Sequence, residues 1–280
     1  MRLPMIGLGT YLTRGSDVEK AIRYALQAGY RAIDTAKCYG NEKEIGEALK
    51  KRRRKRPELN IKREDVFVTT KLFPETENHG EKCRRNVMES LDHLRLDYVD
   101  LVLVHYPRGE RRADSDKRNR TDRERTWKVL ECLQDEAIVG RIGVSNYEIC
   151  HLEEMRLYAK VAPYVNQVEF HPHFERRALR QYCDDNDIVF QAFSSLGRGN
   201  KCLLADQVIV DLGRKYETTA ENILLSWASH HGVAIIPKST QKDRIEANFN
   251  ILKMERSDVK LLDDIDVDRP YTEDAGWMCV

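Results

Sequence analysis

Short apolar runs alternate with longer amphipathic stretches along almost the whole chain. Seven of these runs are nearly continuous in Val, Ile, Leu, Ala and Phe, which is typical of parallel strands buried on both faces. A weaker eighth run begins at Met5, and its glycines allow a ligand or another backbone segment to approach closely. We expect strands at residues 5–10, 31–34, 66–71, 99–105, 142–146, 165–167, 188–193 and 234–239.

Helical periodicity fills the intervals between these strands. Ser16-x-x-Glu19 and Thr218-x-x-Glu221 have the form of capping boxes, and the first helix is expected to stop at Gly29. An additional helix is expected within 203–216. The others are expected near residues 42–50, 82–95, 122–138, 148–159, 176–186, 218–231 and 241–249. This alternation predicts an α/β protein with a (β/α)8 TIM barrel, a fold of roughly 250 residues, forming one domain over residues 1–280.

The composition argues against several classes of protein. The chain has 47 basic and 46 acidic residues, so no overall charge favours nucleic acid or a membrane surface as a partner. Seven cysteines occur without a C-x-x-C pair, which argues against a disulfide framework or a structural zinc site and favours a reducing compartment. No apolar stretch approaches the roughly 20 residues of a membrane span, and no signal peptide is visible at Met1. We therefore expect a soluble, cytoplasmic protein.

Polar residues follow the apolar runs where each strand ends. Asp34, Lys71 and His105 occupy three such positions, far apart in sequence. If the strands close into a barrel, their carboxyl ends meet at one face, where barrel folds keep their sites. The three side chains should therefore converge. Long connections at that face, such as residues 107–126 and the tail after Asp264, would shape a pocket around them.

The motifs at these strand ends resemble those of the aldo-keto reductase family over nearly the whole chain. The first is Gly29–Ala36 followed by Tyr39-Gly40-Asn41-Glu42, which is close to the Asp…Tyr signature of that family. Four more follow in family order: Thr69–Leu72, Leu103–Pro107, Ile142–Asn146 and Ile236–Ser239. The resemblance implies a monomeric reductase of aldehydes and ketones. It also implies that the cofactor is NADPH and that the partner is a small carbonyl compound.

Carbonyl reduction requires a proton for the substrate oxygen as well as a hydride for its carbon. A phenol is a weak acid at neutral pH, and a buried ammonium beside it lowers its pKa. Tyr39 fits the role of proton donor. Lys71 would lower the pKa of the Tyr39 phenol, and Asp34 would keep Lys71 charged. His105 would hydrogen-bond the carbonyl oxygen and share its developing charge. Taken singly, Asp34 could equally be a cap or loop carboxylate and Lys71 a surface charge. A lone Tyr39 is more often a packing residue, and a lone His105 more often a core histidine.

The cofactor assignments also come from the resemblance, since no Gly-x-Gly-x-x-Gly follows a strand. Phe193 stands where the family usually has a tyrosine stacked on the nicotinamide, Ser195 replaces a usual proline, and Ala247 replaces a usual Glu or Gln that contacts adenine. The assigned cofactor residues are Gly9 and Thr10 near the first strand end; Ser145, Asn146, Gln167 and Phe193 for the nicotinamide; Ser194, Leu196 and Arg198 for the pyrophosphate; Lys238, Ser239 and Arg244 for the 2′-phosphate of NADPH; and Asn248 for adenine.

The substrate pocket is the least specific part of the resemblance. Tyr11, Phe73, Tyr106 and Trp277 stand at its lining positions, with core packing as the alternative. Only residues 1–5 precede the first strand, so the usual hairpin that closes the bottom of the barrel is missing and the bottom is expected to be less well plugged.

Four other features of the sequence are not assigned to the proposed site. The basic run Lys50–Arg56 is interpreted as a solvated helix end, with a polyanion patch as the alternative. His171-Pro172-His173 and His230-His231 lack neighbours at metal-ligand spacing, so no metal is expected. Cys38 would be redox-sensitive if it were exposed.

Function within the family divides into two classes. The sequence favours an NADPH-dependent reductase, and the alternative is a cofactor-binding regulatory or structural protein of the same fold with little turnover. Hydrolytic or isomerase chemistry lacks the paired carboxylates or metal ligands that it would need. Neither the physiological substrate nor the favoured direction follows from the sequence.

Overall fold

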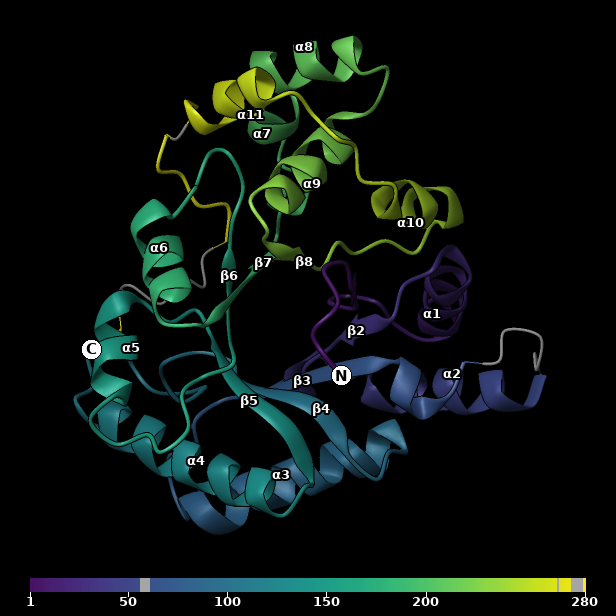
Figure 1. Cartoon of the computed structure of the whole chain (residues 1–280). Helices are drawn as coiled ribbons and strands as arrows, with labels where there is room; N and C mark the ends of the chain where they lie inside the picture. The colour runs from purple at the N-terminus through teal and green to yellow at the C-terminus, as the bar shows by residue number, and fades with distance from the viewer. Residues whose placement is uncertain (56–60, 266, 273–278) are drawn as a thin grey trace.

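The eight predicted strands pair in chain order, each parallel to the next, in the computed structural model of the chain (Figure 1). The structure describes residues 1–55, 61–265, 267–272 and 279–280. The strands are β1 Leu8–Gly9, β2 Ala32–Asp34, β3 Phe67–Leu72, β4 Val99–Val104, β5 Val139–Ser145, β6 Val165–Glu169, β7 Val189–Phe193 and β8 Ala234–Ile235. The sheet closes because Gly7 N donates to Ile235 O (2.8 Å) and Ile235 N donates to Met5 O (2.8 Å). The predicted barrel is confirmed.

The helices lie around the outside of the strands (Figure 1). None of those in the described part of the chain is long and apolar enough to cross a membrane. The α-helices are α1 Ser16–Ala28, α2 Glu42–Lys55, α3 His79–Leu94, α4 Arg118–Asp135, α5 Ile149–Met155, α6 Arg177–Asp185, α7 Lys201–Leu204, α8 Gln207–Lys215, α9 Ala220–His230, α10 Lys242–Phe249 and α11 Arg256–Asp263. Short 3-10 turns are η1 Lys37–Tyr39, η3 Arg63–Asp65 and η4 Gly197–Gly199.

The two predicted capping boxes are wrong in detail. Ser16 is already helical, and Gly15 (φ 53°) occupies the N-cap of α1 without a side-chain hydrogen bond. At α9 the cap is one residue later than predicted, because Thr219, and not Thr218, accepts a hydrogen bond from Asn222 N (3.2 Å).

Two helical segments also differ from expectation. The helix expected within 203–216 is divided into α7 and α8, since the Asp206 side chain accepts from Val208 N (3.0 Å) and starts a new helix. Helix α11 was not predicted, although Val259 and Leu262 are buried on one of its faces.

The inside of the barrel changes from apolar to polar along each strand. Alternate residues of a strand share one face, so the side chains that point inward recur every second position. On β3 these are Phe67 and then Lys71, and on β2 they are Ala32 and then Asp34. On β6, Val165 is followed by Gln167. This gradient puts the apolar filling at the bottom and the polar groups at the carboxyl ends of the strands.

The bottom of the barrel is filled by the N-terminal segment itself. Leu3 is 7% exposed and packs with Ala32, Phe67 and Leu101, which belong to the inward-facing apolar cluster. Its backbone N–H also donates to the Tyr164 hydroxyl (3.2 Å). The residues before the first strand thus contribute one buried side chain to this apolar cluster.

Helices α2 and α3 approach closely at Gly46. A Cβ atom at this position would lie 2.8 Å from Leu94 O and closer still to His93 O, and backbone oxygens cannot move aside cheaply. Gly80 in α3 is a suitable control position, because a Cβ atom there would meet no atom within 4 Å.

We predict that Gly46→Ala lowers the free energy of unfolding by about 1–3 kcal/mol, because the overpacking cost exceeds the gain in helix propensity. Gly80→Ala should be neutral or raise it by up to about 1 kcal/mol. Urea denaturation of both variants checks this, and equal effects at the two sites would contradict the close approach at Gly46.

Candidate active site

A buried ion pair lies at the carboxyl ends of β2 and β3. Lys71 is 1% exposed and Asp34 is 3% exposed, and the Lys71 ammonium donates to Asp34 Oδ1 and to Thr35 O (2.9 Å). Burial lowers the pKa of Lys71, but the neighbouring Asp34 and Tyr39 outweigh it, and the net shift is upward. Lys71 is therefore a charged group held at a fixed place inside the barrel.

Two glutamines extend this pair across the barrel. Gln167 Nε2 donates to Asp34 Oδ2 (2.8 Å) and also to Gln191 Oε1 (2.8 Å). The other Asp34 oxygen is thus satisfied, and four strands, β2, β3, β6 and β7, are linked by polar side chains. Gln191 was missed by the sequence analysis, although its inward position on β7, two residues before Phe193, was a usable signal.

Tyr39 ends the turn η1 and is half-buried, with the Lys71 ammonium 5.1 Å from the centre of its ring. Burial raises the pKa of Tyr39, and the Lys71 charge lowers it by less, so the net shift is upward. The Lys71 ammonium thus acts on the Tyr39 pKa in the expected direction, but desolvation outweighs it. The phenol stays protonated at neutral pH, which is the form that can donate a proton.

His105 follows β4 and lies beside Tyr39, with ring centroids 5.7 Å apart at 72°. Phe73 stacks on its other side (5.0 Å, 30°). Burial, and second the Lys71 charge, lowers the pKa of His105 to about 3, so the imidazole is neutral. The structure thus brings Asp34, Tyr39, Lys71 and His105 together.

Ser145, Asn146 and Gln167 form a second polar group next to the first. Ser145 Oγ donates to Gln167 O (2.8 Å), and Asn146 Nδ2 donates to His105 O (3.0 Å) and to Ser145 Oγ (3.3 Å). The N–H groups of the Gln167 and Asn146 side chains are therefore engaged within the site, which leaves their carbonyl oxygens as acceptors. Acceptors of this kind fit the –NH2 of a carboxamide.

The connection after β7 has unusual backbone geometry. Phe193 and Ser194 are half-buried, and Ser194 (φ 48°) and Arg198 (φ 54°) adopt left-handed conformations. The Arg198 guanidinium lies 5.4 Å from the centre of the Tyr11 ring, so this connection reaches the one after β1. Ser195 Oγ is buried without a protein partner in the described part of the chain, and Leu196 packs against the core. The turn thus offers hydroxyl groups and a cation at the mouth of the barrel.

Lys238 and Arg244 are exposed, and neither forms an ion pair with a described residue. Ser239 and Asn248 lie beside them, 8% and 7% exposed. Lys242, on the same helix as Arg244, pairs with Glu246 instead (3.6 Å). Two unpaired cations near a serine hydroxyl fit a phosphate ester, so this group is chemically suited to a phosphorylated cofactor.

Gly9 and Thr10 are occupied by contacts within the barrel. A Cβ at Gly9 would lie 2.6 Å from Ile236 O, so the close approach at this glycine is to the backbone near β8. Thr10 Oγ1 donates to Asp34 O (2.9 Å) and positions the strand that carries the carboxylate.

Of the four predicted pocket residues, three lie in the described part of the chain. Phe73 lies on His105, and Tyr11 is exposed and lies 5.0 Å from the Tyr39 ring. Tyr106 is 6% exposed, and the Arg108 guanidinium lies 5.0 Å from its ring centre. Trp277 lies outside the described residues.

The chain near the C-terminus is fastened to the end of β6. Glu169 is 3% exposed and accepts hydrogen bonds from Tyr271 N (2.7 Å), Thr272 N (3.1 Å) and His171 Nε2 (3.0 Å). His173 Nδ1 contacts the Tyr271 hydroxyl (2.7 Å). The His-Pro-His segment thus holds this part of the tail across the face of the barrel.

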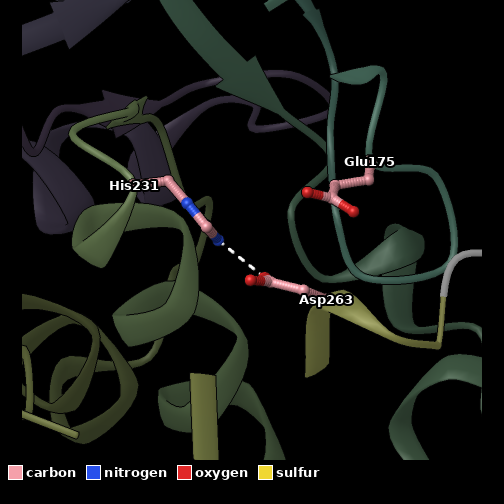
Figure 2. Close-up of side chains that lie close together, drawn as sticks. All are labelled: Glu175, His231 and Asp263. Atoms are coloured by element: carbon pink, nitrogen blue, oxygen red, sulfur yellow. Dashed lines mark hydrogen bonds and ion pairs between the residues drawn. The ribbon is translucent and has the colours of Figure 1, made fainter. Parts of the chain in front are cut away.

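Glu175, His231 and Asp263 form the one group in the described part of the chain whose donor atoms lie near enough for a metal ion, within 4.8 Å of one another (Figure 2). His231 Nε2 contacts Asp263 Oδ1 (2.7 Å), and Arg180 donates to Glu175 (3.2 Å), as does Arg177. Because the two arginines already neutralise Glu175, the group acts as an ion-pair network that ties the ends of α6, α9 and α11.

Lys50 to Lys55 of the basic run lie in α2, and Arg56 lies outside the described residues. Cys38, in η1, is exposed as a residue, yet its sulfur lies 3.5 Å from His105 Nδ1. The sequence analysis did not foresee this contact between the two residues.

We predict that Asp34→Asn lowers the free energy of unfolding by about 3–5 kcal/mol, because the Lys71 ammonium is left buried without its counter-charge. Adding Lys71→Met removes the stranded charge and should recover part of this loss. Urea denaturation at pH 7 measures both variants. If the double variant were no more stable than the single one, an uncompensated ammonium would not be the cause.

Comparison with known proteins agrees with this geometry. The chain matches the Aldo/keto reductase family over residues 5–267. It is 36% identical over 273 residues to 9,11-endoperoxide prostaglandin H2 reductase of Trypanosoma cruzi, covering 96% of this chain and 90% of that protein. It is 37% identical over 270 residues to aldose reductase B of Dictyostelium discoideum, covering 91% and 86%.

Solved structures give the same result. An aldo-keto reductase enzyme from a Medee basin deep-sea metagenome library superposes with a TM-score of 0.86 at 34% identity, covering 96% of this chain and 93% of the other. The aldose reductase of Schistosoma japonicum also gives 0.86, at 30% identity and with 96% and 90% covered. The chain belongs to the aldo-keto reductase family.

Proposed function

We propose that this protein reduces aldehydes and ketones to alcohols with NADPH as cofactor and Tyr39 as proton donor. The observation that carries the proposal is the buried Asp34–Lys71 pair beside a protonated phenol and a neutral imidazole. Membership of the family supports an oxidoreductase that acts on carbonyl groups. The specific cofactor and the roles of single residues are our inference.

The proton is the contribution of the chain itself. Bound NADPH would supply the hydride. As the carbonyl oxygen gains negative charge, Tyr39 donates its hydroxyl proton to it. The resulting phenolate is stabilised by the Lys71 ammonium, which Asp34 keeps in place through its ion pair. The ammonium therefore matters most after the proton has left, which is when its effect on the Tyr39 pKa is needed.

His105 would hold the carbonyl oxygen from a second direction. A neutral imidazole can donate one hydrogen bond, and a donor aimed at developing charge in a desolvated site lowers the barrier. Phe73, on the face of that ring, and Tyr11, beside Tyr39, would present apolar surface to the rest of the substrate. We therefore propose carbonyl compounds with apolar or aromatic groups.

The cofactor side would be held by the two polar groups already described. Asn146 and Gln167 would accept hydrogen bonds from the carboxamide of the nicotinamide, and Phe193 would stack on its ring. Lys238, Ser239 and Arg244 would bind the 2′-phosphate that distinguishes NADPH from NADH. We propose a monomer that acts in the cytoplasm, where seven free thiols suit a reducing environment.

We predict that Tyr39→Phe lowers kcat for aldehyde reduction by about 10²–10⁴-fold, because the proton donor is removed. NADPH oxidation, followed by its near-ultraviolet absorbance with a panel of aldehydes, measures this. Tyr24→Phe, on the outer helix α1, is the matched control and should keep full activity. Equal turnover in the wild type and Tyr39→Phe would exclude Tyr39 as donor, and tight NADPH binding without turnover would favour a regulatory protein.

We predict that Arg244→Ala raises KM for NADPH by about 10- to 100-fold and leaves KM for NADH nearly unchanged, because one charged contact to the 2′-phosphate is lost. Lys242→Ala is the control on the same helix, since Lys242 already pairs with Glu246. Steady-state kinetics with both cofactors tests this. An equal rise for NADH and NADPH would argue against a 2′-phosphate contact.

A further inference from the structure

Cys38 occupies a place that the proposed chemistry does not use. It immediately precedes Tyr39 in η1, and its sulfur lies 3.5 Å from Nδ1 of His105. This thiol–imidazole distance is within hydrogen-bond range for sulfur, and it joins a connection after β2 to the end of β4. The other imidazole nitrogen, Nε2, has no hydrogen-bond partner in the described part of the chain.

The ring of His105 is held in one orientation. Phe73 stacks on one side (5.0 Å, 30°), and Tyr39 meets it nearly edge-on (5.7 Å, 72°). Asn146 Nδ2 donates to His105 O (3.0 Å), and His105 N donates to Leu72 O (2.8 Å), so the backbone is fixed as well. Within this plane the contact with Cys38 places Nδ1 at the sulfur, which leaves Nε2 for a ligand.

The protonation states decide which atom donates. Burial raises the pKa of the Cys38 thiol to about 11, so the sulfur carries its hydrogen at neutral pH. His105, with its pKa lowered to about 3 by burial, carries a single N–H. A thiol is a weak donor and sulfur a weak acceptor, whereas an imidazole lone pair is a good acceptor. The favourable arrangement is thus S–H donating to Nδ1, with the ring proton on Nε2.

We propose that Cys38 is a positioning residue that donates its S–H to Nδ1 and thereby keeps His105 in the Nε2–H tautomer. With the proton on Nδ1 instead, the Nε2 lone pair would face the lone pairs of the carbonyl oxygen, and no hydrogen bond would form. The consequence for turnover rests on the proposed reductase function. The tautomer itself does not, because it is a property of the protein without substrate.

The first test is therefore spectroscopic. Long-range ¹H–¹⁵N spectra of protein labelled at histidine nitrogens report which nitrogen carries the proton, and His105→Gln identifies the signal. The wild type should show Nε2–H. Cys38→Val keeps a comparable volume without a donor and should give a mixture of tautomers, whereas Cys38→Ser keeps a donor and should retain much of the Nε2–H form.

The second test links the tautomer to turnover. Cys38→Val should lower kcat roughly three- to tenfold with KM for NADPH unchanged, which is the size of one modest hydrogen bond, and Cys38→Ser should restore part of it. A Gln at position 105 has no tautomers, so in the His105→Gln background Cys38→Val should have no further effect. A simple packing role would give the same loss in both backgrounds.

The outcomes separate the two proposals. An Nδ1–H signal in the wild type, or an unchanged Nε2–H signal in Cys38→Val, overturns the role of Cys38 whatever the kinetics show. Absence of turnover in the wild type together with the expected tautomer shift would contradict the reductase function and leave the positioning contact intact.

Discussion

The ion pair between Lys71 and Asp34 is the constraint on which the rest of the site depends. Both groups are almost fully buried inside a closed barrel, where an isolated charge would cost several kcal/mol. The fold meets this cost with hydrogen bonds from Gln167 to Asp34 and from Lys71 to Thr35. Replacing a buried ion pair by well-packed apolar side chains is often neutral or stabilising, so the pair is weak evidence for stability. Its place in the site is what sets the charge and hydrogen bonding of its neighbours.

The same desolvated environment assigns different protonation states to three neighbouring groups. Burial raises the pKa of Tyr39 and lowers that of His105, because it disfavours the charged form of each. Lys71 alone remains charged, since Asp34 lies against it. The site thus holds one cation, one neutral acid and one neutral hydrogen-bond donor. This distribution is suited to adding a proton to an oxygen that becomes negative.

Much of the fold followed from the sequence because its determinants are periodic. Strands buried on both faces give continuous apolar runs, and all eight were located, including the short ones at Leu8 and Ala234. The convergence of Asp34, Lys71 and His105 followed from barrel closure alone. Helix starts were less predictable, since Thr218 and Thr219 are chemically equivalent as caps and only the backbone decides between them.

Contacts between residues distant in sequence could not be predicted from the sequence. The strand period places Gln191 inside the barrel, but its partner Gln167 depends on strand register, and the contact of Cys38 with His105 depends on the path of a turn. The filling of the barrel bottom by Leu3 is of the same kind. The net direction of the Tyr39 pKa shift could not be predicted for a related reason. The neighbouring charge was visible from the motif, but the degree of burial that outweighs it belongs to the folded structure.

Residues on the strands and residues on the connections are held in place in different ways. Asp34, Lys71 and Gln167 are set by paired backbone, and moving any of them would disturb the barrel. The groups around the opening are held by side-chain contacts instead, such as the hydrogen bonds from Tyr271 and Thr272 to the Glu169 carboxylate. Connections of this kind can change in length and composition at little cost to the core. The rim can therefore vary while the polar groups in the interior stay fixed.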